Sequence, residues 1–258
     1  MDKRIGAQFY TIRDHIQTIE DFEKSCKRIS EIGYKMVQIS GTPLKAKPMR
    51  EILDKYNLEV VTTHRSYDDF VNKTEDIIEY NKTLGCKLCG MGIMKMELAH
   101  SNAGIDKFLK SAEVFCSELK KEEMYFGYHN HSLEFLKNDG KLVFDRLVEE
   151  TDSDIFRFIV DTYWLQVGGK NPADVITALG KRAMAVHFKD YRVHRENMCE
   201  SRICEVGQGN LDWDGIIEAC DNAGVRFALV EQDTDWVNND PFEAMKMSYN
   251  FLSEKGFI

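Results

Sequence analysis

The chain has 258 residues, of which 43% are hydrophobic and 30% are charged, and its formal net charge is −9 at pH 7. This composition is typical of a globular protein with one large core and excludes an intrinsically disordered chain. The acidic charge argues against nucleic acid as the main partner, because nucleic-acid-binding domains need a basic surface. We expect no membrane segment and no signal peptide, because no apolar run approaches ~20 residues and charges are scattered through the first stretch.

Cysteine usage favours a reducing compartment. The chain has seven cysteines, an odd number that does not form a disulfide framework in a chain of this length, so we expect a cytoplasmic protein. Cys86 and Cys89 have redox or zinc spacing, but they fall in a predicted strand, where their side chains point to opposite faces. We interpret both as core residues.

Short β-branched or apolar runs alternate with longer helical patterns along the whole chain. Eight of these runs have the length and composition of buried parallel strands. They lie at residues 4–9, 35–40, 58–64, 86–91, 124–131, 155–161, 183–189 and 227–231.

The stretches between these runs carry helix start and stop signals. Capping side chains precede the helical patterns at Thr18, Asn171, Asp212 and Asp240, and glycines follow them at Gly33, Gly85 and Gly224. Eight βα units in about 250 residues predict a (β/α)8 TIM barrel, a single domain over residues 1–258. A doubly wound dinucleotide-binding sheet is less consistent, because no Gly-rich turn follows the first strand.

The active site of such a barrel lies at the carboxyl ends of its strands, and polar residues gather there in this sequence. They are Gln8, Tyr10, Ser40, His64, His129, Asn130, His131, Glu134, Asp161, His187, Lys189, Asp190, Glu231, Gln232 and Asp233. Most of them follow strands in the second half of the chain.

Four of these residues predict a metal site. Glu134, Asp161, His187 and Glu231 stand at or just past four successive predicted strands. Three carboxylates and one imidazole make an oxygen-rich site that suits Mn²⁺, Mg²⁺ or Co²⁺ better than a structural zinc. Taken one at a time, each residue could equally be a helix cap or a satisfied core polar group; four in succession favour a metal.

The sequence resembles the xylose isomerase-like barrels, a family that includes sugar epimerases, sugar isomerases and inosose dehydratases. Five short segments in the family's order carry the resemblance: GYHNHSLEF (127–135), DTYWLQVGGKNP (161–172), VHFKDY (186–191), EVGQGNLDW (205–213) and VEQD (230–233). The first half of the chain matches mainly in its strand–helix rhythm. The resemblance implies one divalent metal, Mn²⁺ first with Co²⁺, Mg²⁺ or Zn²⁺ as alternatives, held by Glu134, Asp161, His187 and Glu231. It also implies a sugar or polyol substrate.

Two proton-transfer reactions fit these residues. Glu134 and Glu231 could act as catalytic carboxylates on opposite faces of a metal-stabilised enediolate, which is epimerisation or isomerisation of a sugar. His129, or else His131, could instead act as a base while a leaving group departs, which is dehydration of a keto-sugar or inosose. Either histidine could also serve only to orient another side chain. We expect a metal-dependent sugar isomerase or epimerase, with the dehydratase as the alternative.

Four further residues are candidates for substrate binding: His64, His131, Trp164 and Lys189. Lys189 could contact a substrate oxygen or pair with a neighbouring aspartate, and Trp164 could cover a sugar ring or pack between helices. His64 alone at a strand end is more often structural.

The basic segment 191–210 could be a lid that receives an anionic substrate group, but a solvated loop or a contact between copies of the chain is favoured. Such a homo-oligomer is plausible for a barrel of this size. A non-catalytic sugar-binding or partner subunit is the competing class. A nuclease of the endonuclease IV type is disfavoured, because Trp164 stands where a histidine would be expected and the net charge is negative.

Overall fold

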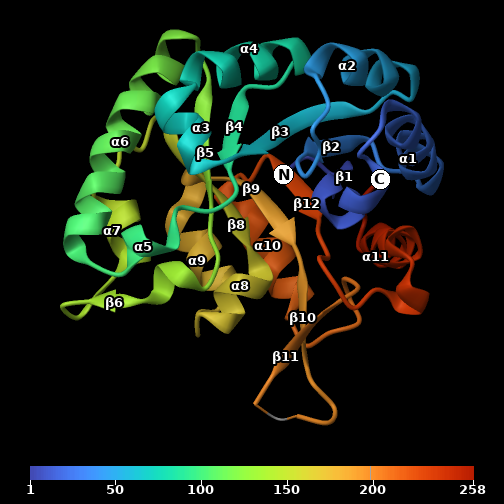
Figure 1. Cartoon of the computed structure of the whole chain (residues 1–258). Helices are drawn as coiled ribbons and strands as arrows, with labels where there is room; N and C mark the ends of the chain where they lie inside the picture. Colours follow the sequence, from blue (N-terminus) through green and yellow to red (C-terminus); the bar gives the residue numbers. More distant parts are fainter. Residues whose placement is uncertain (198) are drawn as a thin grey trace.

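Eight parallel strands and the helices between them close into a barrel, with the first strand paired to the last (Figure 1). The structure is a computed structural model that describes residues 1–197 and 199–258. The barrel strands are β1 (Ile5–Gln8), β2 (Met36–Ile39), β3 (Glu59–Arg65), β4 (Leu88–Met91), β5 (Tyr125–His129), β8 (Phe156–Asp161), β9 (Ala183–Phe188) and β12 (Phe227–Val230). Each agrees with its predicted range to within two residues, which confirms the (β/α)8 barrel.

Helices cover the outside of the barrel. They are α1 (Ile19–Ile32), α2 (Ala46–Lys55), α3 (Tyr67–Asn72), α4 (Thr74–Leu84), α5 (Met96–Ala99), α6 (Asn102–Lys121), α7 (Val143–Glu149), α8 (Thr162–Val167), α9 (Pro172–Leu179), α10 (Trp213–Ala223) and α11 (Pro241–Glu254). Short 3-10 turns are η1 (Phe9–His15), η2 (Leu133–Phe135), η3 (Gly180–Arg182) and η4 (Val237–Asn239). No helix in the described ranges is both long and apolar enough to cross a bilayer.

The predicted capping residues begin and end these helices. The side chains of Thr18, Asn171, Asp212 and Asp240 accept hydrogen bonds from backbone amides in the first turns of α1, α9, α10 and α11. Gly85 and Gly224 follow α4 and α10 in the left-handed conformation that glycine adopts without steric cost. The local signals in the sequence therefore set the element boundaries.

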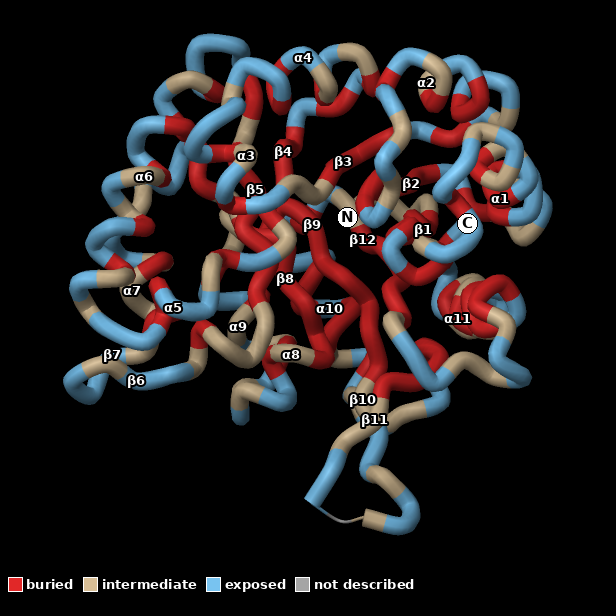
Figure 2. The backbone as a smooth tube through the Cα atoms, viewed as in Figure 1, coloured by how far each residue is buried: buried red, intermediate tan, exposed pale blue. Residues whose placement is uncertain are grey.

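Two apolar layers hold the barrel together. The larger lies between the strands and the helices, and most residues of the barrel strands are buried, as Figure 2 shows. A smaller cluster fills the barrel interior and consists of Met36, Val61, Leu88, Ile159, Met184, Ala185 and Leu229. Gly127 leaves room for this plug, since a Cβ there would lie 2.9 Å from Ile159 Cδ1. This apolar plug occupies the barrel interior, and the polar side chains gather at the strand ends.

The basic segment after β9 is not an irregular loop. It forms a two-stranded antiparallel hairpin, β10 (Asp190–Val193) and β11 (Ser201–Cys204), which projects from the lower edge of the view in Figure 1. A smaller hairpin, β6 (Lys137–Asn138) and β7 (Lys141–Leu142), follows β5. The buried Asp190 carboxylate fixes the base of the larger hairpin by accepting from the amides of Gly207 and Gly209 at 2.9 and 3.0 Å.

The cysteines pack in the core as expected. None of the seven forms a disulfide in the part of the chain that the structure describes, and all but Cys199 are buried. Cys86 precedes β4 and Cys89 lies within it. Burial raises the pKa of both thiols, so neither is a ready metal ligand.

Candidate active site

A cavity of about 520 Å³ opens at the carboxyl ends of the strands. Its volume is within the range of small-molecule sites. Polar side chains from six barrel strands and the segments after them reach it, and they include Gln8, Ser40, His64, His129, His131, Lys189, Glu231 and Asp233. Nine of the fifteen polar residues that the sequence singled out therefore line one cavity.

Four side chains, two of which line this cavity, form a group that could hold a cation. His129, Asp161, His187 and Glu231 each offer one ligand atom, and these atoms lie within 4.8 Å of one another. All four residues are buried. Three of them are predicted metal ligands, whereas His129 was expected as a base or as a residue that orients another side chain.

Unpaired atoms in this group fit a cation. Asp161 Oδ2, His187 Nδ1 and Glu231 Oε2 have no hydrogen-bond partner among the described residues. Leaving buried polar atoms unpaired costs free energy, and a divalent cation would satisfy all three. Two imidazole nitrogens and two carboxylate oxygens are a donor set used by Mn²⁺, Co²⁺ and Zn²⁺.

Asp161 uses its two oxygens differently. Oδ1 accepts from the amide of Trp164 at 2.9 Å and caps α8, and Oδ2 faces the group. The Asp161 amide in turn donates to Asn130 Oδ1 at 3.0 Å. The two interpretations of a strand-end aspartate, helix cap and ligand, are thus compatible, because one carboxylate serves both.

The ring orientations of the two histidines leave one nitrogen of each free. His129 Nδ1 lies 3.3 Å from the carbonyl oxygen of Ile159, which accepts its hydrogen and leaves Nε2 with a lone pair. His187 Nε2 lies 2.8 Å from Gln38 Oε1. Such partners on the far side of the ring are typical of histidines that bind metals.

A third imidazole lies beside the first two. His64 offers a nitrogen within 4.8 Å of ligand atoms on His129 and His187, and its ring centroid is 5.0 Å from that of His129. Burial lowers the pKa of His64 and His129 well below its ordinary value and that of His131 to about 4. The rings are therefore neutral at pH 7, the form that can accept a proton or bind a cation.

Lys189 places a positive charge beside the carboxylates. Its Nζ lies 2.5 Å from Asp233 Oδ2, 3.7 Å from Asp161 Oδ2 and 3.8 Å from Glu231 Oε2. Burial by itself would lower the pKa of Lys189, but these carboxylates raise it well above the ordinary value. Lys189 is thus paired with aspartate, as one interpretation held, and it also lines the cavity, as the other required.

Lys189 lowers the pKa of both Asp161 and Glu231, but burial outweighs this effect at Asp161 only. Burial raises the pKa of Asp161 to about 7. Burial acts in the same direction on Glu231, but Lys189 and His187 hold the pKa of its carboxyl well below the ordinary value. Glu231 is therefore the permanent negative charge of the group, as befits a cation ligand.

Glu134 lies apart from the other predicted ligands. Its Oε1 accepts from the hydroxyl of Tyr128 at 2.5 Å and its Oε2 accepts from the amide of His131 at 2.8 Å. The Tyr128 ring packs in the aromatic layer outside the strands, against Phe108. The chain leaves β5 at His129, so strand alternation no longer directs a side chain five residues later. The structure brings His129 to the group in place of Glu134.

Two other predicted residues lie side by side. The rings of His131 and Trp164 are 5.2 Å apart, and only His131 is among the side chains lining the cavity. Lys189 Nζ lies 5.4 Å from the Trp164 ring centroid. Trp164 therefore packs against His131 and Lys189, and its role as a cover for a sugar ring stays a prediction.

Gln38 was missed by the sequence analysis. It lies on β2, two residues before Ser40, and alternation along the strand would have placed both on the same face. In the sequence, a polar glutamine inside an otherwise apolar strand was the signal that could have identified Gln38 as a site residue. Gln8, noted only as a strand-end residue, is also fully buried beside the cavity.

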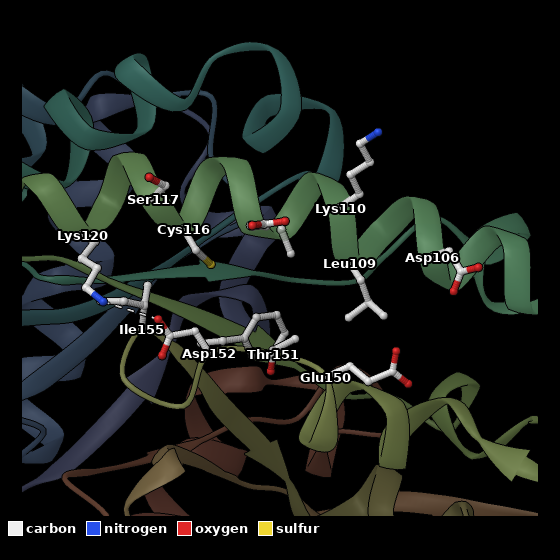
Figure 3. Close-up of a pocket in the computed structure, with 13 residues that line it drawn as sticks. Asp106, Leu109, Lys110, Cys116, Ser117, Lys120, Glu150, Thr151, Asp152 and Ile155 are labelled. Atoms are coloured by element: carbon white, nitrogen blue, oxygen red, sulfur yellow. Dashed lines mark hydrogen bonds and ion pairs between the residues drawn. The ribbon is translucent and has the colours of Figure 1, made fainter.

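A second cavity, of about 730 Å³, lies on the outside of the barrel between α6 and the segment that leads into β8 (Figure 3). Its charged residues include Lys120 and Asp152, which pair with each other at 3.4 Å. None of the described side chains that line it has a buried polar atom without a partner. It therefore lacks the unsatisfied donors and acceptors that distinguish the rim cavity.

Comparison with known proteins finds relatives that cover nearly the whole chain. A protein from Geobacillus kaustophilus (strain HTA426) named inosose dehydratase is 24% identical over 294 residues, which cover 98% of this chain and 92% of that protein. An inosose dehydratase from Clostridium perfringens is 20% identical, over 91% of this chain and 90% of that protein.

Solved structures with the same fold include a sugar phosphate isomerase/epimerase from Parabacteroides distasonis. Its TM-score is 0.82 and its sequence identity 18%, and the match covers 100% of this chain and 96% of that one. A probable 3-DHS dehydratase from Bacillus anthracis has a TM-score of 0.73 and 12% identity, over 97% and 98% of the two chains. The family described as "Xylose isomerase-like TIM barrel" matches residues 26–254. By its sequence, its closed barrel and its rim site, this chain belongs to the xylose isomerase-like TIM barrel family.

Proposed function

We propose that this protein is a cation-assisted dehydratase that removes water from a keto-sugar or keto-polyol. The observation that carries the proposal is the position of the proton-transfer groups. Neutral imidazoles line the cavity, whereas the second carboxylate needed for two-faced epimerisation, Glu134, is engaged by Tyr128 and the His131 amide. The relatives named inosose dehydratase support the same reaction class.

His131 is the base in this proposal. It lines the cavity, and its Nδ1 has no hydrogen-bond partner within residues 1–197 and 199–258. The proton on the carbon next to the substrate carbonyl passes to His131, and the electrons of that C–H bond form the new C=C bond as the neighbouring C–O bond breaks. The same ring then returns the proton to the departing hydroxyl, so water leaves and no co-reactant is required.

Charge that develops on the carbonyl oxygen is stabilised from the floor of the cavity. Lys189 holds its ammonium group there, positioned by Asp233. A divalent cation held by His129, Asp161, His187 and Glu231 would supply Lewis acidity at the same oxygen, an effect of several kcal/mol. The preference for Mn²⁺ stays a prediction, as do a cytoplasmic location and assembly into homo-oligomers.

NMR in D₂O tests the reaction. Cation-saturated protein is incubated with a panel of inososes, keto-sugars and simple ketoses, and the expected result is an unsaturated ketone that has lost one water. His131→Gln should lower the rate by about 10²- to 10⁴-fold, the usual contribution of a general base. His100→Gln, at an exposed histidine, is the matched control.

Deuterium uptake with inversion at the same carbon and no loss of water would instead identify an epimerase. Absence of dehydration from every panel member, with the cation shown to be bound, would also overturn the proposal. Full activity of His131→Gln would be consistent with the proposed dehydration but would exclude His131 as its base.

A further inference from the structure

One buried glutamine contacts the cation group from the opposite side of the barrel. Gln38 is fully buried on β2, and its Oε1 lies 2.8 Å from His187 Nε2 on β9. Strands β1 and β12 separate β2 from β9 around the barrel, so this contact crosses the interior. It ties two residues that are 149 positions apart in the chain.

The contact determines which ring nitrogen of His187 carries hydrogen. A carbonyl oxygen can only accept, so Gln38 Oε1 requires a hydrogen on Nε2 and leaves the lone pair on Nδ1. Nδ1 lies 2.7 Å from Glu231 Oε2, yet neither atom has a hydrogen-bond partner in the described part of the chain. With hydrogen on Nε2, these two atoms face each other with lone pairs at this distance, an arrangement that a shared cation would relieve.

We propose that Gln38 is a positioning residue that holds the His187 ring in its Nε2–H form, so that Nδ1 presents its lone pair beside Asp161 and Glu231. The other tautomer would place a hydrogen on Nδ1, where it would donate to Glu231 and block both atoms from a cation. The tautomer is a property of the chain alone; its consequence for the cation rests on the proposed function.

Nitrogen-15 NMR of the imidazole rings tests the tautomer directly, because protonated and unprotonated ring nitrogens have different ¹⁵N shifts. Protein freed of cations with a chelator is measured at a pH where the His187 ring is neutral. The wild-type protein should show hydrogen on Nε2 of His187. Gln38→Leu, which removes the acceptor, should move hydrogen to Nδ1. Hydrogen on Nδ1 in the wild type, or an unchanged tautomer in Gln38→Leu, would overturn the proposal.

Two more variants separate positioning from simple loss of a buried polar group. Gln38→Glu keeps an acceptor in place and should retain the Nε2–H form. Gln8→Leu is the matched control, because Gln8 is equally buried and pairs in register with Gln38 on the neighbouring strand. The Gln8 carbonyl oxygen accepts from Ser40 and Tyr10 instead of a histidine, so the His187 tautomer should not change in this variant.

Cation affinity gives a second readout that needs no substrate. Titration of the chelator-treated proteins with Co²⁺ should show that Gln38→Leu binds about 10- to 100-fold more weakly than the wild type, with recovery in Gln38→Glu. A shifted tautomer with unchanged affinity would overturn the link to the cation. Dehydratase activity is measured in a separate assay, so the tautomer and affinity results do not depend on whether the proposed reaction occurs.

Discussion

At the scale of single residues, the site concentrates ionisable groups where water is excluded. Asp161, His187 and Glu231 are buried, and Lys189 is 1% exposed. Buried charges are tolerated when they are paired, and removing one partner from such a group is costly. The pKa values and stabilities of these residues are therefore coupled to one another and to any bound cation.

Replacing Lys189 should destabilise the fold. Lys189→Met leaves Asp161, Glu231 and Asp233 without their shared positive partner, and we expect the free energy of unfolding at pH 8 to fall by about 3 kcal/mol. Urea titration monitored by circular dichroism measures the change. Lys24→Met is the control, because that side chain is 74% exposed and its ion pair is worth little. An equal effect in both variants would contradict the role of Lys189.

Glu134 makes stability depend on pH. Burial raises its pKa from 4.5 to about 7, so between these values the folded chain binds more protons than the unfolded chain. The contribution of this group is thus complete below pH 4.5 and is lost as the pH rises to 7. Asp161, whose pKa is also raised to about 7, acts in the same direction.

The unfolding free energy of the wild-type protein should fall as the pH rises from 4.5 to 7. In Glu134→Gln we expect this fall to be smaller, by at most about 3 kcal/mol. Urea unfolding across this range checks it, with Glu113→Gln, at an exposed carboxylate, as the control. A pH profile identical to that of the wild type would show that the Glu134 carboxyl titrates normally.

At the scale of elements, a single carboxylate anchors the projecting hairpin. Asp190 accepts from the amides of Gly207 and Gly209 and, at 2.8 Å, from the indole of Trp213. Together these bonds link β10, the segment after β11 and the start of α10. Basic residues of the hairpin are partly neutralised nearby, since Arg202 lies 3.7 Å from carboxylate oxygens of Glu200 and Asp235.

Asp190→Ala should loosen this hairpin without unfolding the barrel. The loss leaves several donors unsatisfied, at about 1–3 kcal/mol for each buried group. Hydrogen exchange should accelerate at the amides of Gly207 and Gly209 and along β11, and stay slow in β2. Asp14→Ala, at an exposed aspartate of η1, should change neither. If hydrogen exchange accelerated uniformly across the molecule, the substitution would have destabilised the whole fold and not only the hairpin.

At the scale of the whole molecule, a cation held by His129, Asp161, His187 and Glu231 would be linked to folding. The ligand atoms come from β5, β8, β9 and β12, which lie side by side in the barrel, so only the closed barrel brings them together. A ligand that binds the folded state alone stabilises it in proportion to the logarithm of its concentration.

A divalent cation at 100 times its dissociation constant should therefore raise the unfolding free energy by about 2.7 kcal/mol. Thermal unfolding with chelator and with Mn²⁺, Co²⁺ or Zn²⁺, together with elemental analysis, measures the effect and the stoichiometry. Glu231→Gln should abolish the shift and the retention of metal. Glu134→Gln should keep both; if it loses them, Glu134 is a ligand as the sequence predicted.

The sequence predicted the barrel because its signals are local. Alternating apolar runs, caps such as Asp240 and terminal glycines such as Gly85 act within a few residues, so strand and helix boundaries follow from neighbouring side chains. The same reasoning located the rim, since the carboxyl ends of parallel strands meet at one edge. Asp161, His187 and Glu231, each in or next to a strand, were placed correctly together.

Tertiary structure decided the remainder of the site, because direction and distance across the barrel are not local properties. Alternation predicts a side chain's face only inside a strand, and beyond the end of β5 the turn alone directs Glu134 toward Tyr128. The contact of Gln38 with His187 joins strands that are not neighbours and depends on the radius and register of the closed barrel. The sequence by itself therefore determined which residues reach the rim, and the closed barrel determined which of them meet.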